Sequence, residues 1–447
     1  MQSVVTRLVR CRPHHHRFAA RHECSYVSLE NGVMAAGEDF GGSVAAVGVS
    51  IGQGSRYETA ETNGLSAVVH AAALKEASAQ VAKLGGTVTG KVGRESSTYV
   101  ATVLKKHASA AAAALSAAVS TPPSTSAFEA AKASVLAKIG ELPTNEEAII
   151  EEMQQCAYLD TAMGMPVYGS AESVAKLKAS DAAMGSSKGV PFVATAGGDL
   201  AQVVEAFASI PAAASSSSVV PAPSAPPKAI FTGSDKKIYY ESLPVARFAF
   251  AYEFPSLDSE HAAACRLLPY LLTPAKGAYA SKTSCYETYN SHVKIVRDHA
   301  EQNCVETATP FYLPFTDSAL FGIALTAKDV RVEDCSWYTC NNLVRLCFEL
   351  SEAELARAKL AFQSDLLASF ASPGNVVTAY LDDLRVAGRA VAAPELVQRV
   401  NDLDLKALKN LAYTFIHDND HALAAIGPLH ELPDYNWFRT ATYNYHY

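Results

Sequence analysis

Residues 51–74 have the sequence IGQGSRYETAETNGLSAVVHAAAL, and this stretch determines how the rest of the chain is interpreted. Its first half contains the motif GSRYE at positions 54–58 and the turn-forming pair Asn63–Gly64. Its second half places apolar residues at helical spacing. The pattern predicts a helix from about residue 64 to residue 84, because the Gly85–Gly86 pair that follows is typical of a helix C-terminus.

The segments on either side of this helix have the patterns of strands. Residues 26–51 predict a strand, a turn and a second strand, in which Val47, Val49 and Ile51 alternate with small residues. After the helix, residues 87–104 contain two more strand-like segments, joined by Arg94–Glu95.

Composition limits the possible functions. The chain has 447 residues, of which 49% are hydrophobic and 18% are charged, so two domains are expected. The net charge of −8 and the pI near 5.9 disfavour nucleic-acid binding, which needs a concentrated basic face. The longest weakly polar run, around residues 108–119, is shorter than the roughly 20 apolar residues that cross a bilayer. We therefore expect no transmembrane helix, and membrane association only through partners.

The nine cysteines include no Cys-x-x-Cys pair and are odd in number. A secreted disulfide framework or a zinc knuckle has tighter and more regular spacing. The cysteines are therefore interpreted as reduced structural thiols in a reducing compartment.

The first 25 residues differ from the rest of the chain. Residues 1–22 contain five arginines and no acidic residue, with apolar residues between the charges, so they can form a basic amphipathic helix. This is typical of a mitochondrial presequence, and a flexible basic tail is the alternative. The three consecutive histidines within it, residues 14–16, are interpreted as incidental.

A second composition change divides the chain. Residues 211–228, PAAASSSSVVPAPSAPPK, are rich in Pro, Ser and Ala and predict an extended linker between domains at 26–210 and 229–447. The second half repeats the element order of the first, with a strand at 245–254 and a helix at 259–272. Ser351 and Glu354 form a capping-box pattern before a further helix, which Pro373–Gly374 is expected to end.

Six motifs occur in a fixed order along the chain. They are GSRYE, Asn-Gly, Arg-Glu after Gly-Gly, FTGSD at 231–235, TDSALFGI at 316–323 and GPLHELPDY at 427–435. Together they resemble the pitrilysin-type metallopeptidases, a family that includes the mitochondrial processing peptidase and the core subunits of respiratory complex III. The resemblance implies an α+β protein of two homologous α/β sandwich domains, each an antiparallel-rich sheet covered by helices and joined by the Pro/Ser/Ala linker.

The residues that would catalyse hydrolysis in this family are replaced. Active members carry His-x-x-Glu-His shortly after the Asn-Gly pair, and the two metal-ligand positions correspond to Ala67 and Ala71, while the general-base position corresponds to His70. The third ligand, a glutamate, corresponds to Lys138. Zinc hydrolysis needs ligands that hold the ion and a carboxylate that takes a proton from water. We therefore expect no catalytic, metal-binding or cofactor-binding residues and no cofactor.

The resemblance then implies a non-catalytic core subunit of the mitochondrial cytochrome bc complex, of the first, β-like kind rather than the second. Its partners would be the other core subunit, cytochrome b, cytochrome c1 and the Rieske protein, in a dimeric complex. It would lie on the matrix side of the inner membrane. The alternatives are a subunit of a mitochondrial processing peptidase, a metallopeptidase with another ligand set, or a non-hydrolytic peptide-binding relative.

Two further segments bear on these alternatives. Residues 272–286, LTPAKGAYASKTSCY, contain one glycine, which argues against the glycine-rich loop of the processing peptidase α subunit. The aromatic C-terminus, residues 436–447, predicts a contact with another subunit, because exposed aromatic groups are stable when they pack on something.

Overall fold

The computed structural model describes residues 25–29, 32–39, 41–141, 146–182, 191–208, 228–257, 259–273 and 293–443. The predicted presequence, residues 1–25, and the predicted linker, residues 211–228, lie outside these ranges except for one residue each. The glycine-poor segment 272–286 also lies outside them apart from its first two residues.

The chain forms two compact units that are not contiguous halves of the sequence. Unit 1 contains residues 1–140, 165–227 and 369–392, and unit 2 contains residues 141–164, 228–368 and 393–447. Each unit therefore includes one helical segment from the other half of the sequence. These are α13, Pro373–Ala387, in unit 1 and α4, Glu146–Ala157, in unit 2.

Unit 1 is built on a six-stranded sheet with the order β1-β2-β6-β3-β5-β4. Its described strands are β1 Ser25–Ser28, β2 Met34–Glu38, β3 Val44–Ile51, β4 Thr87–Val92, β5 Ser97–Leu104 and β6 Phe192–Ala196. Only the β2–β6 pairing is parallel among these strands. The helices from the first half are α1 Leu65–Ala82, α2 Ala108–Ser120, α3 Thr125–Ile139, α5 Ala171–Lys176 and α7 Leu200–Phe207.

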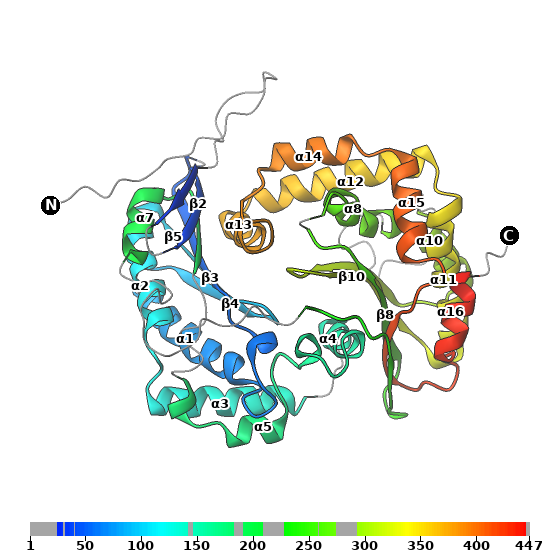
Figure 1. The fold of residues 1–447 in the computed structure, drawn as a ribbon, viewed down its shortest axis with the longest axis horizontal. Coiled ribbons are helices and arrows are strands. Elements are labelled where there is room, and N and C mark those ends of the chain that lie inside the picture. Colours follow the sequence, from blue (N-terminus) through cyan, green and yellow to red (C-terminus); the bar gives the residue numbers. More distant parts are fainter. Residues whose placement is uncertain are drawn as a thin grey trace. The chain divides into compact units, whose positions relative to one another are not determined.

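The central strand β3 explains how both faces of this sheet are covered. Its sequence VAAVGVSI alternates, so that Val47 and Val49 pack in one cluster with Ala77 of α1 and Leu115 of α2. On the opposite face Ala46 packs with helix α13. Figure 1 shows α13 on one side of the strands of unit 1, and α1 and α2 on the other.

Helix α13 lies close to the sheet because the sheet presents small residues to it. Ala36, Ala46, Ala194 and Ala196 from three strands form a cluster with five buried apolar side chains of α13. A Cβ atom added to Gly48 of β3 would lie 2.4 Å from Cγ1 of Val377. Glycine at this position is therefore required by the close approach of the helix.

Unit 2 is built on a five-stranded sheet with the order β7-β11-β8-β10-β9, in which the β11–β7 pairing is parallel. Its described strands are β7 Asp235–Tyr239, β8 Ala246–Phe254, β9 Thr307–Pro314, β10 Ala319–Ala327 and β11 Ala422–Gly427. In addition to α4, its helices are α8 Ala262–Leu272, α10 Lys294–Gln302, α11 Val332–Phe348, α12 Glu352–Phe370, α14 Ala393–Asn401, α15 Leu405–Phe415 and α16 Tyr435–Tyr443.

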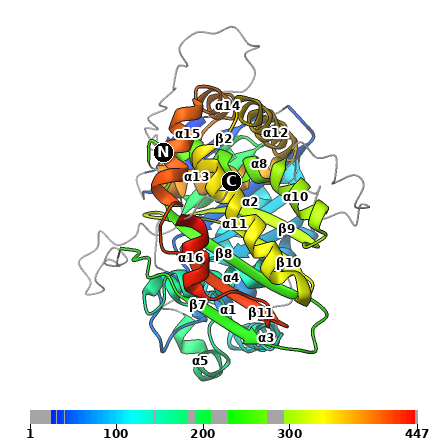
Figure 2. The ribbon, with the colours of Figure 1, turned by 90° about the vertical axis from the view of Figure 1, so that its right-hand side faces the viewer.

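Strand β8, ARFAFAYEF, has one small face and one aromatic face. Ala249 and Ala251 form a cluster with Ile149 and Met153 of α4. The aromatic face includes Phe250, whose ring lies 5.3 Å from that of Phe438 on α16. Figure 2 shows α11, α15 and α16 over this side of the sheet.

The structure confirms the predicted fold class of two helix-covered, antiparallel-rich sheets. It also confirms the capping box, since the Ser351 amide donates to the Glu354 carboxylate at 3.0 Å and the Glu354 amide donates to the Ser351 hydroxyl at 3.3 Å. The Pro373–Gly374 pair lies beyond the end of α12, as expected. It also begins α13, because proline is favoured in the first turn of a helix.

The described part of the aromatic C-terminus, residues 436–443, packs on its own unit through Phe438, and residues 444–447 lie outside the described residues. Phe438 is fully buried, while Tyr443 is 55% exposed. An intersubunit contact therefore stays a prediction for the exposed part of α16. None of the helices in the described ranges is both long and apolar enough to cross a bilayer.

Candidate functional site

The GSRYE motif and the Arg94–Glu95 pair, 39 residues apart in sequence, contact each other directly beside α1. Arg56 donates to the carboxylate of Glu95 at 2.5 Å, and both side chains are almost completely buried. The backbone amide of Arg56 donates to the carbonyl oxygen of Arg94 at 2.9 Å. A Cβ atom at Gly54 would lie 2.3 Å from the same carbonyl oxygen, so only glycine allows the two segments to approach this closely.

Glu58, the last residue of GSRYE, holds the start of α1. Its carboxylate accepts hydrogen bonds from the amides of Gly64 at 2.8 Å and Ser66 at 2.6 Å, and from the Asn63 side chain at 3.1 Å. A carboxylate at this point satisfies free amides and interacts favourably with the positive end of the helix dipole. Gly64, with φ of +93°, supplies the turn that admits the chain into the helix.

Ala67, His70 and Ala71, at the positions predicted to correspond to two metal ligands and the base, lie on α1, and the two alanines pack in an apolar cluster. Ala67 is 2% exposed and clusters with Val68, with Phe128 of α3 and with Val174 of α5. Ala71 is partly buried and packs against the same cluster. The methyl groups at both positions therefore serve helix packing.

His70 is buried between the sheet and α3. Its ring stacks on Tyr99 of β5, with 4.6 Å between ring centroids and an interplanar angle of 27°. Burial, together with the positive charge of Lys138, lowers the pKa of His70 to about 4. The imidazole is therefore neutral at physiological pH.

Lys138 lies near His70, as its electrostatic effect on the imidazole shows. Its ammonium group donates to the hydroxyl oxygen of Tyr168 at 2.6 Å and lies 4.2 Å from the centroid of that ring. The structure thus brings together Ala67, His70, Ala71 and Lys138 on two packed helices, α1 and α3.

These four side chains do not fit a zinc ion. Two methyl groups donate no electron pair, and an ammonium group repels a cation. The one remaining imidazole is a single donor in an aliphatic environment. No carboxylate occupies the general-base position, so no hydrolytic step can be derived from these residues.

Three residues beside this site were not identified from sequence. Tyr99 stacks on His70, Tyr168 binds Lys138, and Arg385 of α13 pairs with the second carboxylate oxygen of Glu95. Tyr99 and Tyr168 lie in unremarkable strand and loop sequence. Arg385 comes from the other half of the chain, and nothing in the linear sequence relates it to Glu95.

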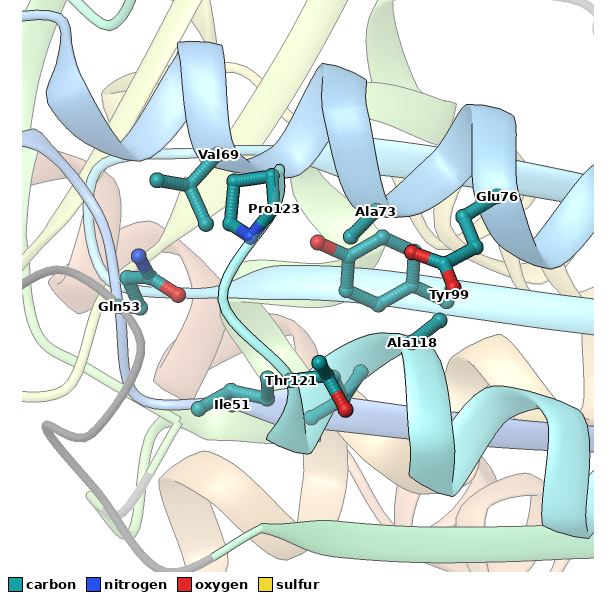
Figure 3. A pocket seen from close by; sticks show the side chains of 10 residues that line it. Ile51, Gln53, Val69, Ala73, Glu76, Tyr99, Ala118, Thr121 and Pro123 are labelled. Carbon is teal, nitrogen blue, oxygen red and sulfur yellow. The ribbon is translucent and has the colours of Figure 1, made fainter. Parts of the chain in front are cut away.

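A small pocket lies on the side of Tyr99 next to α1 and the end of α2. Figure 3 shows Val69, Ala73 and Glu76 of α1 around it with Gln53 and Tyr99. Its volume is ≈ 10 Å³, which is the space of about one water molecule. This pocket is too small for a peptide or a cofactor.

Comparison with known families agrees with this arrangement. Residues 33–171 match the family described as insulinase (peptidase family M16), and residues 199–362 match the peptidase M16 inactive domain. The first match contains α1 and α3, and so all four positions described above.

Several individual proteins are similar over nearly the whole chain. The probable mitochondrial-processing peptidase subunit beta of Arabidopsis thaliana is 26% identical, covering 96% of this chain and 83% of the relative. The mitochondrial-processing peptidase subunit beta of Mus musculus is 24% identical, covering 93% and 86%.

Solved structures show the same fold. A chain of complex III2 from Candida albicans, with Inz-5 bound, matches with a TM-score of 0.80 and 22% identity, over 93% of this chain and 99% of that chain. A protease from Helicobacter pylori matches with a TM-score of 0.75 and 14% identity, over 91% and 100%. With both halves matched and the fold shared, this chain belongs to the M16 peptidase family.

Proposed function

We propose that this chain is a non-catalytic core subunit of mitochondrial respiratory complex III, with a scaffolding role in assembly and dimerisation. The single observation that carries the proposal is the packing of α1, where Ala67 and Ala71 belong to an apolar cluster and the buried His70 stacks on Tyr99 and feels the charge of Lys138. This arrangement retains the fold of the family without the groups that hydrolysis needs. The likeness to a chain of complex III2 supports the proposal.

The expected setting follows from this role. The subunit would lie on the matrix side of the inner membrane and contact the other core subunit, cytochrome b, cytochrome c1 and the Rieske protein. Since none of the described helices can cross a bilayer, these contacts would hold it at the membrane. The presequence predicted at residues 1–25 agrees with import into mitochondria.

A second candidate function is a subunit of a mitochondrial processing peptidase. The observation that favours it is the similarity, at 24–26% identity, to relatives named as processing peptidase β subunits. This alternative requires either another ligand set for the metal or a role in binding peptides without hydrolysis.

Co-migration with cytochrome b distinguishes the two candidates. Mitochondria that carry the tagged chain are solubilised in mild detergent, and the complexes are separated on a native gel. We expect the chain in the same band as cytochrome b and its haem. A band that contains one other peptidase-like chain and no cytochrome b would support the processing peptidase and contradict the core-subunit proposal.

Peptide cleavage gives an independent test of the lost site. The chain is purified with its partner, incubated with a presequence peptide and compared with a His70→Ala variant. We expect no cleavage by either protein and the same metal content in both. Cleavage that disappears together with one bound zinc ion in the variant would show that α1 still carries a metal site.

A further inference from the structure

Three side chains of the types that ligate metals form a cluster in unit 2. They lie at helices α10 and α11, away from the site on α1. His299 of α10, Cys304 after α10 and Cys335 of α11 are at most 1% exposed. One nitrogen of His299 and the two thiol sulfurs all lie within 4.8 Å of one another. It is the one group of three possible metal ligands among the residues that the structure describes.

The end of α10 positions the first two of these side chains. Asn303 has a φ of +49°, and the amide of Cys304 donates to the carbonyl oxygen of His299 at 3.2 Å. Together, the left-handed residue and the hydrogen bond from the amide of residue i+5 to the carbonyl of residue i form a Schellman motif. This motif folds the chain back over the last helical turn. The motif therefore places Cys304 against His299 although four residues separate them.

Thr339 determines which nitrogen of His299 carries the proton. The Thr339 hydroxyl donates its one hydrogen to the carbonyl oxygen of Cys335 at 2.7 Å, and it lies 3.0 Å from Nε2 of His299. The hydroxyl oxygen must then accept a hydrogen from Nε2. A buried imidazole that carries its proton on Nε2 holds a free electron pair on Nδ1.

The electron pair on Nδ1 of His299 is buried and has no hydrogen-bond partner. Buried polar atoms are nearly always satisfied, and a buried acceptor without a donor is destabilising. A neutral histidine that donates its other N–H to a fixed acceptor is the arrangement that orients a metal ligand. The Cys304 thiol lies 3.8 Å from the carbonyl oxygen of His299, and its sulfur and that of Cys335 are within 4.8 Å of each other.

We propose that His299, Cys304 and Cys335 form a zinc-binding site within unit 2. Imidazole and thiolate are the donors that Zn²⁺ prefers, and two thiolates with a neutral imidazole balance its charge of +2. The site therefore adds no net charge to a buried region. Zinc distances of about 2.3 Å to sulfur and 2.0 Å to nitrogen require the donors to draw together by roughly 1 Å.

The role of this site is structural rather than catalytic. It would link the end of α10 to the first turn of α11, two elements that the hydrogen bonds His299–Thr339 and Asn342–Asp298 already join. The three protein donors leave one position of a tetrahedral ion to a non-protein ligand. Their burial prevents access by a peptide substrate.

Metal analysis of the full-length protein tests the proposal. The wild-type chain, Cys304→Ala, Cys335→Ala and the control Cys347→Ala are purified from zinc-supplemented cells and dialysed. Cys347 is a matched control because it is a buried thiol of the same helix α11 and lies outside the cluster. We expect about one zinc ion per wild-type and control chain, and at least a roughly tenfold loss in the two cluster variants.

Two measurements on the wild-type chain keep the test valid if the cluster variants do not fold. In the first, replacement of zinc by Co²⁺ should give sulfur-to-cobalt charge-transfer absorption. In the second, bound zinc should protect Cys304 and Cys335, but not Cys347, from alkylation in mild denaturant. Wild-type protein with no bound zinc, cobalt spectra without the thiolate band, or equal alkylation of the three thiols would overturn the proposal. Bound zinc that is lost in His70→Ala but retained in Cys304→Ala would also overturn the proposal.

Discussion

His70 shows how one residue can keep a family position while its chemistry changes. The side chain stacks on Tyr99 and lies near the ammonium group of Lys138, so both the apolar surroundings and the nearby charge favour the neutral imidazole. A carboxylate general base would be stabilised by the same cation. The residues at positions 70 and 138 are therefore compatible with folding and supply neither a carboxylate base nor a third metal ligand.

The lowered pKa of His70 predicts acid sensitivity. The pKa rises from about 4 in the folded state to about 6.5 in the unfolded state, so the unfolded chain binds more protons in this window. The contribution of His70 to the free energy of unfolding is therefore fully present above about pH 6.5. It falls by about 3 kcal/mol as the pH is lowered toward about 4. Urea unfolding of His70→Leu at several pH values should show a shallower loss on the acid side than wild type.

His430 supplies the control for this experiment, because its side chain is 59% exposed. His430→Gln should retain the wild-type dependence of unfolding free energy on pH. Equal acid-side losses in wild type and His70→Leu would show that His70 does not titrate with the predicted shift.

At the scale of elements, β3 in unit 1 and β8 in unit 2 each turn small residues toward a helix from the other half of the sequence. In unit 1, Ala46 and Gly48 of β3 face α13, and in unit 2, Ala249 and Ala251 of β8 face α4. The small side chains at these positions let the helix backbones approach the two strands. On its other face each of the two strands carries larger residues, which pack on helices of the same half.

Gly48 tests how closely α13 must approach β3. In Gly48→Ala the new methyl group would lie 2.4 Å from Cγ1 of Val377 and 2.9 Å from Cδ1 of Leu381. We expect overpacking to lower the free energy of unfolding by about 1–3 kcal/mol. Chemical denaturation measures this change.

Two variants sharpen the interpretation. Gly52→Ala, which adds a methyl group where no heavy atom lies within 4 Å, should change stability by less than about 0.5 kcal/mol. Val377→Ala should partly restore the stability of Gly48→Ala in the double variant, because it removes the atom that clashes. Additive losses in the double variant would contradict the proposed contact.

At the scale of the whole molecule, the exchange of α4 and α13 makes each unit depend on both halves of the chain. Five apolar residues of α13, Val376, Val377, Tyr380, Leu381 and Leu384, are buried in unit 1. Burial of each such side chain is stabilising by about 2 kcal/mol before the entropy cost of ordering the helix, so unit 1 loses a large apolar contribution without α13.

Separate expression of the two halves tests this dependence. Residues 1–227 lack α13, and residues 228–447 lack α4. We expect neither fragment alone to unfold cooperatively, whereas co-expression should give a soluble complex with a cooperative transition. The full-length chain cleaved at a protease site inserted at residues 211–228 is the control and should stay associated. A cooperative transition in residues 1–227 alone would show that unit 1 folds without α13.

The sequence by itself determined the class of the fold, the order of the elements around residues 51–74, and the residues at the α1 positions. Strand and helix periodicity, caps and turn glycines are local signals, so they predicted α1 and β3 and the capping box of α12. Only the tertiary structure decided which elements cover each sheet and which side chains meet. Arg385 and Glu95 are separated by 290 residues, and His299 and Cys335 lie on different helices, so no periodic pattern connects them. The periodicity of apolar residues predicts which face of a helix or strand is buried. Which other element packs on that face depends on side-chain packing and charge in the folded chain.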